Sequence, residues 1–239
     1  VVEVNTVSFI GDLHLVVIGT KKGHLVLADA DTGSVIEAYQ AHDGQVWSVD
    51  VGSDGRTIAT CSSDKTVKFW ELKRKEDKTK LKCVKTLQVQ DEALAVKMSR
   101  DLRLIAVSTM DMTVKVFFMD SLKIFLTLFG HKLPVTSLDI SSDCKTLISG
   151  SLDKSIKVWG LQFGELRKSI LAHSEAVTCV KFILNSTAFA SVGRDKQVKT
   201  WMASGAFKPL QRSFEKHFGE ILSLAVSPSF VVTGSVDKA

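Results

Sequence analysis

Residues 131–160 read HKLPVTSLDISSDCKTLISGSLDKSIKVWG, and this stretch decides the fold class. The side chains from Val135 to Ile140 alternate between two faces, which is the two-residue period of a β-strand. Two further short runs, 146–151 and 155–159, follow after turns that contain Ser-Asp and Leu-Asp-Lys. Strands of five or six residues bounded by turn residues predict an all-β protein. The whole chain has three prolines, so little interrupts its strands.

The same pattern returns along the chain at a nearly constant interval. An Asp closes a tight turn before an alternating strand five times, and the interval between successive ones is roughly 42 to 47 residues. An aromatic residue stands six positions after each of the first four, and a Ser, a Thr or, once, a Val stands four positions before each of the five. A His precedes three of them at one constant offset, and the last at an offset two positions shorter. The five are Asp64, Asp111, Asp153, Asp195 and Asp237.

These intervals divide the chain into a weakly marked first repeat, four full repeats and a partial last one. The first repeat keeps the spacing of its strands, but Lys22 and Ala28 stand at its Asp and aromatic positions. The predicted repeats are 1–41, 42–88, 89–130, 131–172, 173–216 and 217–239. We expect them to form one incomplete domain over residues 1–239, because a single repeat cannot bury both faces of its sheet.

A period of about 42 residues, four short strands per period and a recurring His, Asp and Trp resemble the WD40 repeat. The resemblance implies an all-β fold, a β-propeller of four-stranded antiparallel blades around a central channel. Propellers of this family commonly have seven blades. We therefore expect the chain to be part of a seven-bladed ring, and the lack of an initiator Met suggests a piece of something longer.

The resemblance also implies a role for the recurring polar residues. In WD40 proteins the Trp donates to a Ser or Thr hydroxyl, the hydroxyl meets the His, and the His meets the Asp, in a buried chain of hydrogen bonds. Val89, Val107 and Phe117 replace three members in one repeat, and we expect that blade to hold by packing. The carried-over sets are His42, Thr60, Asp64 and Trp70; His131, Ser149, Asp153 and Trp159; His173, Ser191, Asp195 and Trp201; and His217, Thr233 and Asp237, which lacks a Trp.

A catalytic interpretation of these sets is the alternative. His131, Ser149 and Asp153 have the composition of a hydrolase triad. A triad occurs once per active site, however, whereas this set recurs with a Trp attached. We therefore predict a structural role, no catalytic residues and a protein that is not an enzyme.

Composition and cysteine spacing exclude several other classes. With 45% hydrophobic and 24% charged residues, the chain is neither disordered throughout nor fibrous. Cys61, Cys83, Cys144 and Cys179 form no CxxC or CxxH pair, so we predict reduced, buried thiols, no metal site and no cofactor. No apolar stretch approaches the ~18 residues that span a bilayer, and we expect that residues 1–5 are not part of a signal peptide. We expect neither a membrane nor a small-molecule substrate as a partner.

Particular stretches look like one branch of the WD40 family. The stretches 120–125, 128–135, 157–165, 168–169, 41–44 and 112–117 are similar to the second propeller of large nucleolar WD40 subunits of the UTP-B complex, in the small-subunit processome. This similarity implies a non-enzymatic scaffold for pre-rRNA processing in the nucleus and nucleolus. It would bind other WD40 subunits of UTP-B and lie close to the guide snoRNA and the 5′ spacer pre-rRNA. A generic WD40 adaptor in ubiquitin ligation or signalling stays open, because propellers host unrelated functions.

The charge of the chain is concentrated in one segment. The chain has 31 Lys+Arg and 26 Asp+Glu, a net charge of +5, and residues 71–85 alone contribute seven basic and three acidic residues, a net charge of +4. This segment is the insertion that makes its repeat the longest of the full repeats. We expect a long basic loop between the third and fourth strands of its blade, which either contacts phosphate or is a solvated, mobile loop without a partner. The candidate contact residues are Lys73, Arg74, Lys75, Lys78, Lys80 and Lys82.

Overall fold

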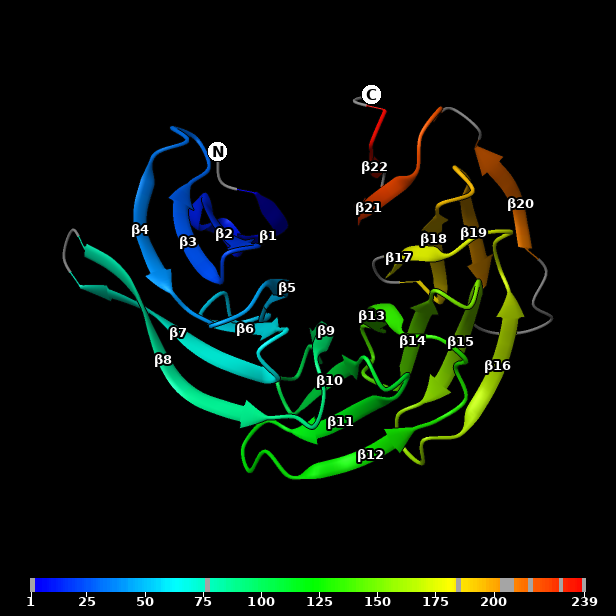
Figure 1. The fold of residues 1–239 in the computed structure, drawn as a ribbon, viewed down its shortest axis with the longest axis horizontal. Coiled ribbons are helices and arrows are strands. Elements are labelled where there is room, and N and C mark those ends of the chain that lie inside the picture. The colour runs from blue at the N-terminus through cyan, green and yellow to red at the C-terminus, as the bar shows by residue number, and fades with distance from the viewer. Residues whose placement is uncertain are drawn as a thin grey trace. The chain divides into compact units, whose positions relative to one another are not determined.

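A computed structural model describes residues 3–75, 78–183, 186–202, 209–214, 217–227 and 230–237 (Figure 1). Within these residues the chain forms twenty-two strands and a single 3-10 turn, η1 (Gly11–Leu13). The predicted all-β class is therefore confirmed. That turn is the one helical element among the described residues, and it is far too short to cross a membrane.

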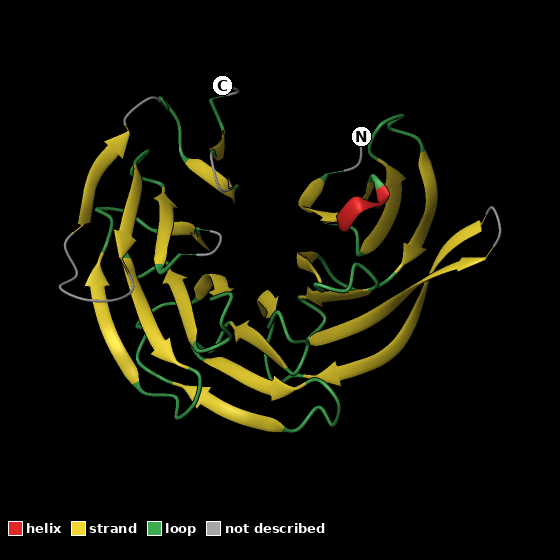
Figure 2. Ribbon diagram, turned by 180° about the vertical axis from the view of Figure 1, so that it is seen from behind, coloured by secondary structure: helices red, strands yellow, loops and turns green. Residues whose placement is uncertain are grey.

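The strands are grouped into antiparallel sheets of four, each formed by strands that are consecutive in the chain (Figure 2). Five such sheets and one two-stranded sheet lie within the described residues. Consecutive strands pair because the turns between them are short, so each sheet is a meander. This is the blade architecture of a WD40 β-propeller. The seven-bladed ring and the division into repeats stay predictions.

The chain divides into two compact units, of which the first holds residues up to Met110 together with Val116–Phe125. It contains two complete sheets and most of a third, whose strands β11 and β12 extend past its limits. The strands are β1 (Val4–Ile10), β2 (Leu15–Thr20), β3 (His24–Asp29), β4 (Val35–Gln40), β5 (Val46–Val51), β6 (Thr57–Ser62), β7 (Thr66–Lys75), β8 (Lys78–Gln88), β9 (Ala93–Met98), β10 (Leu104–Thr109), β11 (Val114–Phe118) and β12 (Ile124–Leu128).

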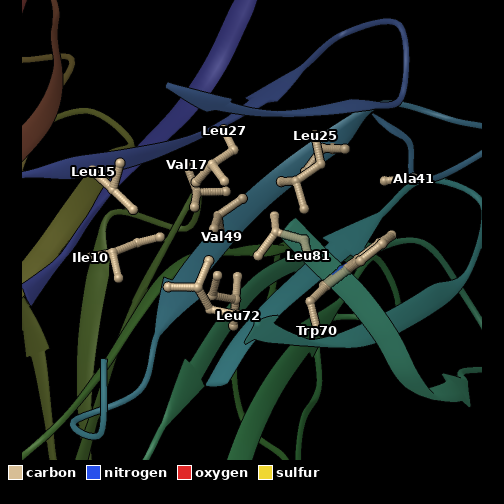
Figure 3. Close-up of a cluster of buried hydrophobic side chains, with 12 residues drawn as sticks. Ile10, Leu15, Val17, Leu25, Leu27, Ala41, Val49, Trp70, Leu72 and Leu81 are labelled. Atoms are coloured by element: carbon tan, nitrogen blue, oxygen red, sulfur yellow. The ribbon is translucent and has the colours of Figure 1, made fainter. Parts of the chain in front are cut away.

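The core of this unit lies between neighbouring sheets. Val17 and Leu25 of the first sheet pack with Val49, Trp70 and Leu81 of the second in one buried cluster (Figure 3). A second cluster fills the space between the second sheet and the third. Each sheet therefore completes the core of its neighbour, which is why such repeats are stable only as an array.

The second unit comprises Asp111–Lys115 and the chain from Leu126 onward. Its sheets also pack face to face, around Ile148, Val158 and Phe189 in one cluster and Val192 and Ile221 in another. The strands are β13 (Val135–Ile140), β14 (Thr146–Ser151), β15 (Ser155–Gly160), β16 (Leu166–Leu171), β17 (Val177–Phe182), β18 (Ala188–Gly193), β19 (Val198–Met202), β20 (Pro209–Phe214), β21 (Ile221–Val226) and β22 (Val231–Ser235).

Hydrogen bonds join the first strands of neighbouring sheets inside each unit. In the first unit the buried Asp50 of β5 accepts hydrogen bonds from the backbone N–H of Met98 and the ammonium of Lys97, both at 2.8 Å. In the second unit Asp139 of β13 accepts one from the backbone N–H of Phe182 at 2.7 Å. A charged side chain thus bonds the backbone of the next sheet, which fixes the distance between sheets as well as their packing.

The basic insertion of the second repeat is not a loop, so that expectation is wrong. Strands β7 and β8 stay paired along their whole length, from Thr66 opposite Gln88 to Lys75 opposite Lys78. The physical reason is that Leu72 and Leu81 stand opposite each other and are buried in the first core cluster, which continues the sheet outward. The insertion is a long β-hairpin. The side chains of Lys75 and Lys78 lie outside the described residues.

Candidate functional site

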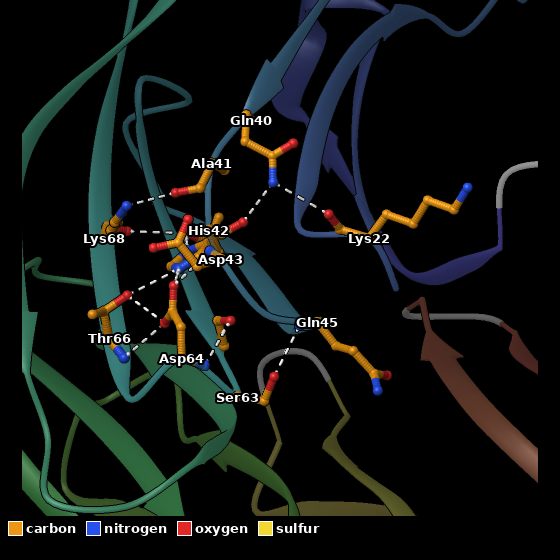
Figure 4. Close-up of polar contacts among 12 residues, drawn as sticks. Lys22, Gln40, Ala41, His42, Asp43, Gln45, Ser63, Asp64, Thr66 and Lys68 are labelled. Atoms are coloured by element: carbon orange, nitrogen blue, oxygen red, sulfur yellow. Dashed lines mark hydrogen bonds and ion pairs between the residues drawn. The ribbon is translucent and has the colours of Figure 1, made fainter.

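The first recurring set forms a continuous chain of hydrogen bonds. The indole N–H of Trp70 donates to the hydroxyl of Thr60 at 3.0 Å, and that hydroxyl lies 2.7 Å from Nε2 of His42. On the other side of the ring, Nδ1 lies 2.8 Å from the carboxylate of Asp64 (Figure 4). These three bonds join residues that are 10, 18 and 22 positions apart, which are the constant spacings of the recurring set in the sequence.

Two further sets in the second unit have the same geometry. The imidazole Nε2 lies 2.7 or 2.8 Å from a Ser hydroxyl, Nδ1 lies 2.8 to 2.9 Å from an Asp, and the indole N–H donates to the same hydroxyl at 2.8 to 2.9 Å. The residues are His131, Ser149, Asp153 and Trp159, and His173, Ser191, Asp195 and Trp201.

The set near the end of the chain is shorter and looser. His217 Nε2 lies 2.7 Å from the hydroxyl of Thr233, but its Nδ1 is 3.2 Å from the nearer oxygen of Asp237. Its imidazole is 13% exposed, whereas those of His42 and His173 are fully buried.

Burial sets the charge state of these residues. Because the imidazoles of His42, His131 and His173 are buried, their pKa values lie below the usual value of histidine, although the neighbouring carboxylates oppose the shift. Burial alone would raise the pKa of Asp64 and Asp153. The hydrogen bonds that these carboxylates accept outweigh it, so both pKa values are lowered, and that of Asp153 falls to about 2. At neutral pH a neutral imidazole therefore faces a carboxylate.

A neutral imidazole orders the donors in one direction. The indole N–H donates to the hydroxyl, the hydroxyl donates to Nε2, and the N–H of Nδ1 donates to the carboxylate, so the network assigns the ring proton to Nδ1. The hydroxyls of Thr60, Ser149 and Ser191 belong to fully buried residues. The hydroxyls of Ser149 and Ser191 each lie between an imidazole and an indole, and that of Thr60 also lies 3.4 Å from the carbonyl of Lys68, so none of the three is an exposed nucleophile.

The carboxylate also ties together two loops. Asp64 accepts a hydrogen bond from the backbone N–H of Asp43 at 3.1 Å, and Asp153 accepts one from Lys132 at 2.9 Å. In each case the donor follows the His of the set. Asp64 also accepts from the backbone N–H of Thr66, two residues on, which forms an Asx turn. Lys65 between them has a φ of 64°, in the left-handed region.

In the repeat 89–130, which has no His, the carboxylate of the turn Asp is bonded by a different residue. Val89, Val107 and Phe117 are buried in the second core cluster. The carboxylate of Asp111, however, is bonded by the ammonium of Lys115 at 2.9 Å. Packing alone therefore does not describe this repeat, because its turn retains an ion pair.

A recurring Lys is the residue that sequence reasoning missed. Lys68 donates from its ammonium to the carbonyl of Ala41 at 2.6 Å, and Lys199 donates to that of Ala172 at 2.8 Å. Both carbonyls immediately precede the His of their set. The signal was present, since a Lys stands four residues after each of the first four turn Asp residues, at Lys68, Lys115, Lys157 and Lys199.

All four cysteines carry free thiols. Cys61 is fully buried, and burial raises the pKa of its thiol. Cys83 is exposed on β8, and Cys144 and Cys179 are partly exposed, so the expectation of four buried thiols is wrong for these three. The reason for Cys83 is that β8 is the outer strand of its sheet. Across the described residues, no three His, Cys, Asp or Glu side chains are grouped as metal ligands.

The hairpin of β7 and β8 places three lysines on one face. Lys73 stands opposite Lys80, and Lys82 stands opposite Glu71, while Leu72 and Leu81 pair on the other face. We call Lys73, Lys80 and Lys82 the lysine face. Arg74 is opposite Thr79 and shares the face of Leu72, so the basic candidates do not all lie on one side.

Meanders of four strands, a period of about 42 residues and the His, Ser/Thr, Asp and Trp chain define a WD40 β-propeller. This chain belongs to the family of the WDR3 second beta-propeller domain, whose family model matches residues 2–239.

Named relatives match about half of the chain. The chain is 42% identical over 146 residues to "U3 small nucleolar RNA-associated protein 12" of Saccharomyces cerevisiae, which covers 56% of this chain and 16% of that protein. It is 47% identical over 126 residues to "WD repeat-containing protein 3" of Homo sapiens, covering 50% and 13%. A homologue from Dictyostelium discoideum is 40% identical over 140 residues, covering 56% and 15%. The matched segments thus cover 13% to 16% of the length of these relatives.

Proposed function

We propose that this chain is a scaffold domain in small-subunit ribosome biogenesis, acting in the nucleolus as part of the processome. The observation that carries the proposal is the match of residues 2–239 to the WDR3 second beta-propeller family. The yeast relative, whose name associates it with U3 small nucleolar RNA, supports the direction of the proposal. The partners would be other WD40 subunits of the UTP-B complex, with the guide snoRNA and the 5′ spacer pre-rRNA close by.

The chemistry of the recurring sets supports a non-catalytic role. A hydrolase needs a serine that a substrate can reach and donors that stabilise an oxyanion. Here Ser149 and Ser191 are fully buried, and each hydroxyl is held between an imidazole and an indole. A fluorophosphonate probe should therefore label neither serine in the native protein, and labelling of either one would contradict the proposal.

Affinity purification of the full-length protein from nuclear extract tests the scaffold role. The proposal requires recovery of UTP-B subunits, U3 small nucleolar RNA and 5′ spacer pre-rRNA, and a nucleolar signal for the tagged protein in cells. Recovery of ubiquitin-ligase or signalling subunits without these RNAs would replace the proposal by the adaptor alternative. Depletion of the protein should also reduce early pre-rRNA cleavage, and unchanged processing would contradict the proposed function.

A further inference from the structure

We propose that the lysine face of the β7–β8 hairpin binds the phosphate backbone of RNA, without reading its sequence. This inference rests on the proposed function and deepens it, because it assigns one RNA-binding surface to described residues. The segment 71–85 carries a net charge of +4, and the whole chain carries +5. Attraction to a polyanion is therefore concentrated on this hairpin.

The ammonium groups of the lysine face repel one another in the free protein. Lys73 and Lys80 stand directly opposite each other, and like charges in this position destabilise a sheet. Lys73 lies 3.5 Å from Glu71, and Lys80 lies 3.7 Å from Glu37. Both lysine side chains are at least half exposed, and exposed pairs of this kind contribute little. Among the described residues no carboxylate pairs with Lys82. A row of phosphates would neutralise this face.

The opposite face holds the hairpin in place. Leu72 and Leu81 are 7% and 6% exposed and pack into the first core cluster. The backbone N–H of Leu81 donates to the phenol oxygen of Tyr39 on β4 at 2.8 Å, and the ring of Tyr39 lies 6.1 Å from that of Trp70. Because these contacts order the strands before binding, a ligand loses less affinity to ordering than it would on a flexible loop.

The composition of the face favours phosphate over bases as the contact. No aromatic residue occurs between Glu71 and Lys85, so this part of the hairpin has no aromatic platform on which a base could stack. Lysine ammonium groups act as point charges on phosphate and carry no sequence information. Binding should therefore be tolerant of sequence and should weaken steeply as salt concentration rises.

The test compares three variants of the full-length protein by fluorescence anisotropy, with a labelled single-stranded 30-nucleotide RNA of mixed sequence at several salt concentrations. The hairpin variant carries Lys73→Gln, Lys80→Gln and Lys82→Gln. The charge-matched control carries Lys22→Gln, Lys123→Gln and Lys145→Gln at exposed positions outside the hairpin. The third variant, Arg74→Gln, removes one charge from the opposite face. Thermal melts establish that each variant is folded.

We expect the hairpin variant to bind the RNA roughly ten- to a hundredfold more weakly near 0.1 M salt, with a salt slope reduced by up to about 2 units. The charge-matched control and Arg74→Gln should change both quantities much less. Equal affinities and slopes for the hairpin variant and its charge-matched control would overturn the inference. So would unchanged RNA binding with increased self-association, which would show that the lysines protect an edge strand instead.

A competition separates RNA from an acidic protein as the partner. Poly-glutamate should displace the labelled RNA only at a large molar excess of charge, and displacement at equal charge would overturn the commitment to RNA. Failure of the lysine-face inference can be distinguished from failure of the proposed function. If the hairpin variant still copurifies with UTP-B subunits and U3 RNA but shows no change in direct RNA binding, only the lysine-face inference fails.

Discussion

His173 illustrates how a single residue holds two loops together. Its fully buried imidazole bonds the hydroxyl of Ser191 on one side and the carboxylate of Asp195 on the other. The backbone N–H of Ser174 donates to the same carboxylate at 3.1 Å. Loss of the ring would leave a buried hydroxyl and a buried carboxylate each short of a partner.

Replacement of His173 by Ala should therefore destabilise the protein by roughly 1–3 kcal/mol, because unsatisfied buried polar groups cost that much. His14 is the matched control, since its side chain is 71% exposed and pairs with the exposed Asp31. His14→Ala should cost much less. Urea denaturation measures both changes, and equal shifts of the two midpoints would contradict a structural role for the buried set.

The buried imidazoles also predict the dependence of stability on pH. The pKa values of His42, His131 and His173 are lower in the folded state than the value of about 6.5 in the unfolded chain. The unfolded state therefore takes up more protons below about pH 6.5, and stability falls as the pH drops toward the lowered values. Asp153, whose folded pKa is about 2, adds a second loss below about pH 4.

The measurement is the free energy of unfolding in urea between pH 8 and pH 4. It should be level above about pH 6.5 and decline below it. The His173→Ala variant should show a shallower decline, because one buried imidazole no longer resists protonation. Greater stability at pH 5.5 than at pH 7.5 would be incompatible with neutral buried imidazoles.

At the scale of elements, strands β5 and β9 are joined by Asp50. This side chain bonds the backbone N–H of Met98 and the ammonium of Lys97 in the next sheet. Asp50→Ala should destabilise the protein by about 1.5–3 kcal/mol, the range for hydrogen bonds to charged groups. It should also accelerate amide exchange at Met98. Asp31→Ala, at an exposed position, is the control, and unchanged exchange at Met98 would show that the bond does not hold the sheets together.

The hairpin offers a second test at this scale. Leu81 is 6% exposed and Val84, on the same strand, is 47% exposed. Leu81→Ala should cost about 2 kcal/mol or more, because it leaves a cavity in the first core cluster. Val84→Ala should cost far less. If thermal melts shift equally for the two variants, the hairpin is not anchored as its contacts indicate.

At the scale of the whole chain, strands are the main regular structure of the described segments, and the 3-10 turn of three residues is the one helical element among them. The far-UV circular dichroism spectrum should therefore have the shape typical of β-sheet, with little helical signal. The hairpin variant of the lysine face should give the same spectrum, since its substitutions lie on exposed positions. A spectrum dominated by helix would contradict the propeller fold.

The sequence alone determined the fold class. Alternation over stretches such as Val135–Ile140 is local and has the period of a strand, and the interval of about 42 residues repeats that pattern along the chain. The spacing of the recurring His, Ser or Thr, Asp and Trp could also be predicted from the sequence. Residues at equivalent positions of similar four-stranded meanders have the same neighbours in space. The recurring Lys four residues after the turn Asp carried the same kind of signal and was missed.

Only the tertiary structure decided the features that depend on neighbouring sheets. From its sequence the insertion is predicted to be a charged loop. In the structure Leu72 and Leu81 are buried against the preceding sheet, and this burial keeps the two strands of the insertion paired. The bond from Asp50 to Met98 joins residues 48 positions apart. Burial and pairing between sheets are properties of the assembled array, and no local pattern encodes them.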